Sequence, residues 1–213
     1  MSSVAVFRKI RRNARDYGLK TCAAKMLAAG ASVVYERRVY RLYRIGVQSK
    51  DWYWPQSQSF RFRLLELQDR NAIRQIEKLA DCVEGMIEPT LASGGLCCVV
   101  YDGPRVIGFN LINLQQMNIP LIKLHRPLRH GDAWSEHIAV DKLYRKLGLA
   151  IQIRWCVLAE LKRRGYRYLY GGTLVSNIAS LRLTRAVGFR ELVDITYQQF
   201  LGRRDYKVKR VRP

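Results

Sequence analysis

Apolar residues are concentrated in several short segments that predict strands, and over 60–67 they alternate with polar residues, which is the pattern of a strand that buries one face of a sheet. These segments are 60–67, 96–101, 105–114, 134–140, 167–174 and 190–200. Between them, apolar residues recur every three or four positions, which predicts helices over 69–83, 151–164 and 178–187. With a short helical piece before residue 96, the order β-α-α-β-β-β-α-β-α-β predicts an α/β (α+β) fold, in which helices pack on one mixed sheet.

Turn residues separate these elements. Asp102 and Gly103 stand between two apolar strands and tolerate positive φ, so they predict a hairpin. Asp69 opens the first helix as a candidate N-cap. Residues 115–133 contain two prolines and a glycine among basic residues, which predicts a long loop with one short strand at 119–124. A long loop on a compact core is a common place for substrate binding.

The first sixty residues have another pattern. From about residue 3 to 45 they are rich in Ala, Lys, Arg and Leu, and their apolar residues fall at helical spacing, which predicts two or three basic amphipathic helices. The stretch 51-DWYWPQSQS-59 has no clear period and predicts a linker. We therefore expect a basic helical extension with its linker at 1–59 and the main domain at 60–213.

Charge is the strongest feature of the composition. The 213 residues include 38 Lys and Arg against 17 Asp and Glu, a formal net charge of +21. This balance favours anionic partners, which include nucleic acid, lipid headgroups, an acidic carrier protein and phosphorylated ligands. The five cysteines show neither C-x-x-C spacing nor a histidine at metal-ligand spacing, so we expect buried thiols in a reducing compartment and no metal.

Membrane insertion and secretion are both disfavoured by the sequence. The longest apolar run near the start, 21-TCAAKMLAAGASVVY-35, contains Lys25 and is shorter than the roughly 20 residues that cross a bilayer. A signal peptide would need an unusually long basic leader, and no small-residue cleavage site is convincing. A cytoplasmic protein is expected.

The segment 145-RKLGLA-150 lies between a predicted strand and a predicted helix. The first N–H groups of a helix have no intrahelical partner and attract anions, and Gly148 and Ala150 would let a phosphate approach that backbone closely. Arg145 and Lys146 add positive charge beside the helix end. The segment predicts a phosphate site, with a turn or packing role for the glycine as the alternative.

A second motif, 177-NIASLRLTRAVGF-189, has an Asn that opens a helix directly after a strand, small residues one turn in, and a Gly-Phe pair that ends the helix. Together with 138-IAVDKLYRKLGLA-150, which contains the pattern Arg-x-x-Gly-x-Ala, it resembles the GCN5-related N-acetyltransferase (GNAT) superfamily. The resemblance is specific over about 134 to 190. It implies a mixed, mostly antiparallel sheet flanked by helices, and an enzyme that moves an acetyl or longer acyl group from a thioester to an amine.

The resemblance also implies roles for the loop and the strand before it. The pyrophosphate of acetyl-CoA, or of a longer acyl-CoA, would bind backbone N–H groups of the loop, and the pantetheine arm would pair with the strand. Asn177 would hydrogen-bond the pantetheine, with a simple helix N-cap as the alternative. The residues implied in coenzyme binding are Ile138, Ala139, Val140, Arg145, Lys146, Leu147, Gly148, Leu149, Ala150 and Asn177.

The catalytic candidates are Glu136 and Thr184. An amine that attacks a thioester must be neutral, and Glu136 is the first candidate for the base, with a solvated or ion-paired carboxylate as the alternative. Strand alternation would send His137 to the opposite face, so only one of the two would reach the cleft. Thr184 stands where the family has a Tyr that protonates the leaving thiolate, and a Thr hydroxyl is a poor acid.

The partners remain open at this stage. The acceptor would be a small-molecule or peptide amine. The charge and the N-terminal helices also fit an acidic acyl carrier protein, as in the long-chain N-acyl amino acid synthases that the chain resembles, or an anionic membrane surface touched by 4-VAVFRKIRRNAR-15. Otherwise these helices pack on the core. Alternatives of another class are a non-catalytic acyl-CoA-binding module and an RNA-binding module that stacks bases on Trp52, Tyr53 and Trp54, although nucleic acid is disfavoured because no RNA-binding motif occurs.

Overall fold

The computed structural model describes residues 35–80 and 83–211 of the chain. The predicted helices over residues 3–34 therefore lie outside the described residues. The described chain forms two compact units. The larger one consists of Tyr40–Asp194 with residues 209–211, and the smaller one of residues 35–39 and Ile195–Val208.

The predicted strands and helices occur in the predicted order, and further strands are added to them. The strands are β1 (Tyr35–Gly46), β2 (Arg61–Leu64), β3 (Leu96–Asp102), β4 (Arg105–Asn113), β5 (Gln116–Ile119), β6 (Leu124–Pro127), β7 (Asp132–Val140), β8 (Tyr168–Leu174), β9 (Arg190–Phe200) and β10 (Arg203–Arg210). The helices are α3 (Arg70–Leu79), α4 (Ile87–Ala92), α5 (Leu149–Arg163) and α6 (Ile178–Val187), with short 3-10 turns η1 (Val47–Ser49), η3 (Pro120–Ile122) and η4 (Lys142–Tyr144).

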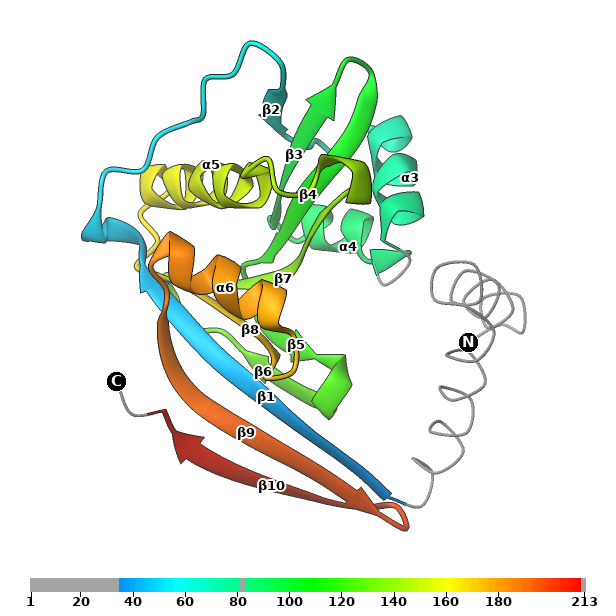
Figure 1. Ribbon diagram of the computed structural model, residues 1–213, viewed down its shortest axis with the longest axis vertical. Helices are drawn as coiled ribbons and strands as arrows, with labels where there is room; N and C mark the ends of the chain where they lie inside the picture. Colours follow the sequence, from blue (N-terminus) through cyan, green and yellow to red (C-terminus); the bar gives the residue numbers. More distant parts are fainter. Residues whose placement is uncertain (1–34, 81–82, 212–213) are drawn as a thin grey trace. The chain divides into compact units, whose positions relative to one another are not determined.

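The larger unit is built on one mixed sheet with the strand order β9-β1-β8-β7-β4-β3-β2 (Figure 1). The pairs β1–β8, β4–β7, β3–β4 and β2–β3 are antiparallel, and β7–β8 is parallel. β5 and β6 form a separate hairpin. The predicted mixed, mostly antiparallel sheet is confirmed.

Helices cover both faces of this sheet, and β3 shows how. Cys98 and Val100 belong to a hydrophobic cluster with the inner residues of α5 and the end of α6, whereas Cys97 and Val99 belong to a second cluster with α3 and α4. In Figure 1, α5 and α6 accordingly lie on one side of the sheet and α3 and α4 on the other. A strand buried on both faces has a continuous apolar sequence, which explains the run LCCVVY. The thiols of Cys97, Cys98 and Cys156 are free and buried.

The helical prediction was wrong for the end of the N-terminal segment. Residues 35–46 form β1, and its residues 40–46 pair with β8 in an unbroken register. Tyr40, Tyr43 and Ile45 are buried, while arginines stand between them. The long-range pairing and the aromatic and β-branched residues outweigh the helical spacing read from the neighbouring basic segment.

Three other predictions need correction. Residues 116–127 form two strands, β5 and β6, where a loop with one strand was expected. β10 was not predicted; in the smaller unit it follows β9 through Leu201 and Gly202, which both have positive φ. Asp69 precedes α3 but does not cap it, because its carboxylate accepts hydrogen bonds from Arg63 and from the N–H of Glu66. Within the described ranges, no helix is long and apolar enough to span a membrane.

Candidate active site

A fork opens in the middle of the sheet between β7 and β8. The two strands pair only at residues 132–134 of β7 and 168–170 of β8. Beyond these residues β7 stays paired with β4 and β8 stays paired with β1, so the facing edges separate. A pocket of about 380 Å³ lies at the fork. It is lined by residues of β1, β7, β8 and α5, the start of α6, the connection before α4, and the end of β5 with the turn after it.

Two glycines of β8 make room for two tyrosine rings of β1. A Cβ on Gly171 would lie 2.5 Å from the ring of Tyr43, and a Cβ on Gly172 would overlap the ring of Tyr40. Both rings line the pocket. Burial raises the pKa of both phenols, so they remain protonated at neutral pH and can donate hydrogen bonds.

β7 carries one extra residue opposite β4. Ser135 pairs with Ile112 and His137 pairs with the residue before it, so Glu136 has no partner in the register. Such a bulge resets the alternation of side chains. His137 therefore stacks on Phe109, with 5.8 Å between ring centres, and lines the pocket together with Glu136. The expectation that only one of these two side chains would reach the cleft was wrong.

The carboxyl group of Glu136 is half-buried in the pocket. Its Oε2 atom is buried and has no hydrogen-bond partner among the residues that the structure describes. Burial raises the pKa of Glu136 to about 7. A carboxyl group with this pKa gives and takes a proton readily at neutral pH, as a general base must.

The loop after β7 passes through left-handed backbone at two positions. Asp141 accepts a hydrogen bond from the N–H of Leu143 and so holds the first turn. Arg145 is extended, Lys146 has φ +68°, and Gly148 has φ +74° and is the N-cap residue of α5. A turn of this kind can direct backbone N–H groups toward one concave side, where an anion can bind.

The N–H groups predicted to bind phosphate are available. Those of Lys146, Leu147 and Gly148 donate to no backbone carbonyl in the described part of the chain. Those of Leu149 and Ala150 lie in the first turn of α5, where intrahelical acceptors are missing and no side chain caps the helix. Five consecutive donors therefore stand at one helix start.

The free edge of β7 leads from this loop into the fork. Residues 138–140 pair with residues 108–110 of β4 on one side, and no described strand pairs with them on the other. Alternate backbone groups of an antiparallel strand point away from its partner, so some of these groups face the fork. The Nε of Arg145 lies 3.4 Å from the carbonyl oxygen of Val140, to which it donates.

Asn177 lies at the other wall of the pocket, at the start of α6. Its Oδ1 accepts a hydrogen bond from the N–H of Ser180 at 3.1 Å, so the side chain is a helix N-cap. Asn177 lines the pocket, and its Nδ2 donates to no described residue. The cap and a contact with a ligand are therefore compatible roles.

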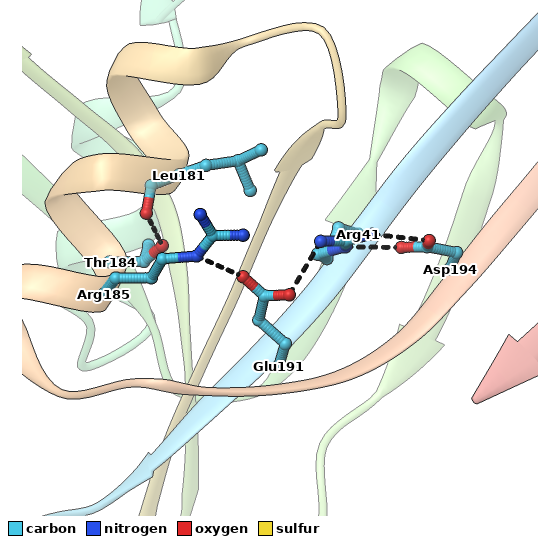
Figure 2. A network of polar contacts seen from close by, with 6 residues as sticks. All are labelled: Arg41, Leu181, Thr184, Arg185, Glu191 and Asp194. Atoms are coloured by element: carbon cyan, nitrogen blue, oxygen red, sulfur yellow. Dashed lines mark hydrogen bonds and ion pairs between the residues drawn. The ribbon is translucent and has the colours of Figure 1, made fainter. Parts of the chain in front are cut away.

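Thr184 is in a different position from the one its predicted role requires. It is 2% exposed, it does not line the pocket, and its Oγ1 donates a hydrogen bond of 2.9 Å to the carbonyl oxygen of Leu181 in the preceding turn (Figure 2). A hydroxyl whose proton is held by its own helix has no route to a leaving group in the fork. The geometry therefore gives no support to Thr184 as the acid.

Beside Thr184, a network of ion pairs links β1, α6 and β9 (Figure 2). Arg41 donates from Nε and Nη2 to both carboxylate oxygens of Asp194, each at 2.7 Å, and from Nη1 to Glu191 at 2.7 Å. The other oxygen of Glu191 accepts from Arg185 at 2.8 Å. Bidentate pairing of this kind is the strongest form of the arginine–carboxylate contact.

α5 carries a buried arginine that the sequence patterns did not single out. Arg154 is 2% exposed and lines the pocket. Its Nη1 donates to Oδ1 of Asn110 at 2.9 Å and to Oγ of Ser135 at 2.5 Å. Its Nε is buried without a partner, and no described acidic side chain pairs with it. Burial lowers the pKa of Arg154, as expected for a charge without a counter-ion.

The neutral partners of Arg154 also hold the bulge in place. Nδ2 of Asn110 donates to the carbonyl oxygen of His137 at 2.8 Å and to Oγ of Ser135 at 3.1 Å. α5, β4 and β7 are therefore joined at the closed end of the fork. Helical spacing could have found Arg154, because it lies on the buried side of α5 with Val157.

Comparison with protein-family models identifies one family. The model described as Acetyltransferase (GNAT) family matches residues 40–189. No curated protein matches the sequence. Among solved structures, the chain is similar to a GCN5-related N-acetyltransferase from Sphaerobacter thermophilus, with a TM-score of 0.59 and 17% identity, covering 86% of this chain and 57% of that one.

Two further structures share the fold. For a GNAT-family protein from Novosphingobium aromaticivorans the TM-score is 0.52 at 20% identity, covering 76% of this chain and 65% of that one. For an aminoglycoside acetyltransferase from an uncultured soil metagenomic sample, in complex with trehalose, the TM-score is 0.50 at 12% identity, covering 62% of this chain and 89% of that one. The chain thus spans little more than half the length of the Sphaerobacter protein.

Proposed function

The chain belongs to the GNAT acetyltransferase family. From this premise we propose that it is an N-acyltransferase whose fork binds an acyl-coenzyme A and passes the acyl group directly to an amine. One observation carries the proposal. Free N–H groups at the start of α5, the unpaired edge of β7 and the half-buried carboxyl of Glu136 follow one another along the fork.

The coenzyme would bind in the order of these features. The pyrophosphate would accept hydrogen bonds from the backbone N–H groups of residues 146–150, where the partial positive charge of the helix end adds to the side chains of Arg145 and Lys146. The pantetheine amides would pair with the edge of β7 at residues 138–140, and Nδ2 of Asn177 would donate from the opposite wall. This order would bring the thioester to Glu136.

The reaction would be a direct attack. Glu136 would accept a proton from the acceptor, the neutral amine would attack the thioester carbonyl, and a tetrahedral oxyanion would form. The carbon–sulfur bond would then break, the attacking nitrogen would lose its second proton through water, and the coenzyme thiolate would leave and take up that proton, so that a neutral amide and a free thiol form. The phenols of Tyr40 and Tyr43 would donate hydrogen bonds to the oxyanion or to the sulfur, because their raised pKa keeps them protonated.

Other partners are alternatives within this mechanism. The net charge of +21 would attract any anionic donor, which includes acyl-CoA itself and a thioester on an acidic acyl carrier protein. Acetyl-CoA is the first donor to test, and a longer acyl-CoA the second. The acceptor would be a small-molecule or peptide amine.

Two measurements on the full chain test the proposal. Thermal unfolding with acetyl-CoA should show stabilisation of about 2.7 kcal/mol at a hundred times Kd, and incubation with amines should release the coenzyme thiol. No stabilisation by any acyl-CoA together with no thiol release would overturn it. If only an acylated carrier protein is active, and activity falls with salt, the donor is the carrier protein.

A pair of glycine variants locates the coenzyme. Gly148 and Gly165 stand at the two ends of α5, and both have positive φ. A Cβ added to Gly148 would lie 3.9 Å from Nε2 of Gln152, and one added to Gly165 would have open space around it. Alanine at either position therefore carries a similar backbone strain of about 1 kcal/mol. Only Gly148→Ala should weaken acetyl-CoA binding, since only that side chain enters the phosphate loop. Equal weakening by both variants would contradict the placement of the pyrophosphate.

A further inference from the structure

The pocket contains a buried positive charge that no described acidic side chain neutralises; the ring of Phe189, 5.5 Å from the guanidinium carbon, attracts this charge but supplies no counter-ion. The guanidinium of Arg154 is almost fully buried, and the two side chains that accept its hydrogen bonds, Asn110 and Ser135, are neutral. Such contacts satisfy N–H groups but do not cancel a charge. Burial of an unpaired ion costs several kcal/mol, so a protein that keeps one has a reason outside its fold.

The edge of this guanidinium is suited to a carboxylate. Nη1 makes both hydrogen bonds to the protein, Nε is buried without a partner, and Nη2 donates to no described residue. Nε and Nη2 form the side that binds both oxygens of a carboxylate, as Arg41 does with Asp194. The free side therefore matches a planar, two-oxygen anion.

The pocket also contains a carboxyl group, but it does not pair with Arg154. Ser135 shares the α5 face of the sheet with Arg154, whereas the next residue, Glu136, is the bulge residue and lies on the other face with His137. The strand itself keeps the two charged groups apart. A ligand in the fork can meet both.

Arg154 lies on the far side of the proposed reaction centre from the coenzyme loop. Along β7, residues 140 to 138 come first, Glu136 next, and Ser135, which contacts Arg154, last before the strands close at Trp134. An apolar acyl chain at this end would leave the charge buried and unpaired. A carboxylate would neutralise it.

We propose that Arg154 binds a carboxylate of the substrate at the closed end of the fork, so that the enzyme selects a reactant that carries one. This inference rests on the proposed function of the fork. The carboxylate has two possible sources: the far end of a dicarboxylic acyl group, as in malonyl-CoA or succinyl-CoA, or an acceptor such as an α-amino acid. Both place the anion beside the thioester.

The test compares carboxylate and neutral reactants in two arms. In the donor arm, acetyl-CoA and succinyl-CoA are compared with a simple amine; in the acceptor arm, acetyl-CoA is given amino acids or their amides. We expect at least a tenfold preference in kcat/KM for the carboxylate form in one arm, which identifies the source. In Arg154→Met the preference should fall below twofold, while thermal stabilisation by acetyl-CoA persists.

A matched control is Arg163→Met on the same helix, since Arg163 is exposed and pairs with Glu160. This variant should keep the preference. If Arg154→Met does not fold, Arg154→Lys keeps the charge but loses the two-oxygen contact, and should reduce the preference partly.

Three results would overturn the inference while leaving the proposed function intact: acetyl-CoA binds and reacts but neither arm shows a preference, the preference survives in Arg154→Met, or Arg163→Met abolishes it equally. Failure of every acyl-CoA to bind or react, in contrast, would overturn the proposed function itself and this inference with it.

Discussion

Arg41 and Arg154 are both in the larger unit, but the charge of Arg41 is paired with acidic side chains and that of Arg154 is not. Arg41 is paired with two carboxylates, and one of them is shared with Arg185 (Figure 2). Arg154 is more deeply buried and is paired with none. The first arrangement joins elements of the fold, and the second leaves a charge available to a ligand.

Two glutamates repeat the contrast. Glu191 is bound on both oxygens by arginines, whereas Glu136 has a buried oxygen without any partner among the described side chains. A buried charge with an ion-pair partner stabilises the fold. A buried charge without a partner lowers the stability of the free protein, and a bound reactant can then supply the missing partner. The unsatisfied groups, Glu136 and Arg154, both line the fork pocket.

Substitution of Glu136 and of Glu191 by glutamine should give the largest effects on kcat and on stability, respectively, and so distinguish the fork pocket from the ion-pair network. Glu136→Gln should lower kcat by about 100-fold or more, because a general base contributes roughly 10² to 10⁴, with little loss of stability. Glu191→Gln should do the reverse: reduced stability and nearly unchanged kcat. Thiol release at saturating substrates and urea unfolding measure both. An unchanged rate for Glu136→Gln at every pH would remove Glu136 from the mechanism.

Removing each arginine tests the same contrast in stability. Arg41→Met leaves two half-buried carboxylates without their partner and should destabilise the protein by about 2 kcal/mol, less than the 3–5 kcal/mol of a fully buried pair. Arg154→Met replaces an uncompensated buried charge by an apolar side chain of similar length and loses two hydrogen bonds to neutral groups, so it should leave the free energy of unfolding unchanged or raise it by up to about 4 kcal/mol. Chemical denaturation measures the stability of both variants. Equal losses of stability would contradict the view that Arg41 stabilises the fold and Arg154 does not.

The pH dependence should distinguish the fork from the network. The pKa of Glu136 is raised in the folded protein, from an ordinary value of 4.5 to about 7. Folding therefore favours its protonated form, and stability from this group is complete below about pH 4.5 and is lost as pH rises to about 7. Activity should rise over the upper part of this range, as the carboxylate forms. The difference in stability between wild type and Glu136→Gln should follow that curve; a flat difference would contradict the raised pKa.

Thr184→Val should give the smallest effect. It removes one hydrogen bond to the carbonyl of Leu181, within the helix, and should cost less than about 1 kcal/mol. Because Thr184 lies outside the pocket, kcat should stay within twofold in the thiol-release assay. A tenfold loss of kcat without a loss of stability would restore Thr184 as a candidate for the acid.

Local signals in the sequence predicted much of the fold. The bounds of α6 and β9 agree with the predicted 178–187 and 190–200, because Asn177 caps one end of the helix and Gly188 takes a left-handed conformation at the other. The hairpin between β3 and β4 was predicted because its turn residues, Asp102 and Gly103, tolerate positive φ, and Gly103 has a φ of +53°. β1 was missed because its partner lies far along the chain and its arginines extended the composition of the segment before it.

The features of the site that are local in sequence could likewise be predicted, whereas those that depend on contacts between distant segments could not. The loop at 145–150 could be predicted, since the glycine, the basic residues and the helix start are adjacent in sequence. The bulge at Glu136 could not, because it is a mismatch between β7 and β4 and is invisible in β7 alone. The isolation of Arg154 depends on which residues of two other strands face it, so no local pattern contains it.

The pairing of β1 with β8 has a consequence for how the protein is made. Tyr40 pairs with Leu174 and Gly46 with Tyr168, so one strand leaves the ribosome long before its neighbour. Contacts between such distant segments form slowly, and an unpaired strand is open to aggregation meanwhile. The arginines between the buried residues of β1 would act as gatekeepers during this wait, because charge opposes edge-to-edge association. Part of the chain's positive charge would thus protect the nascent polypeptide.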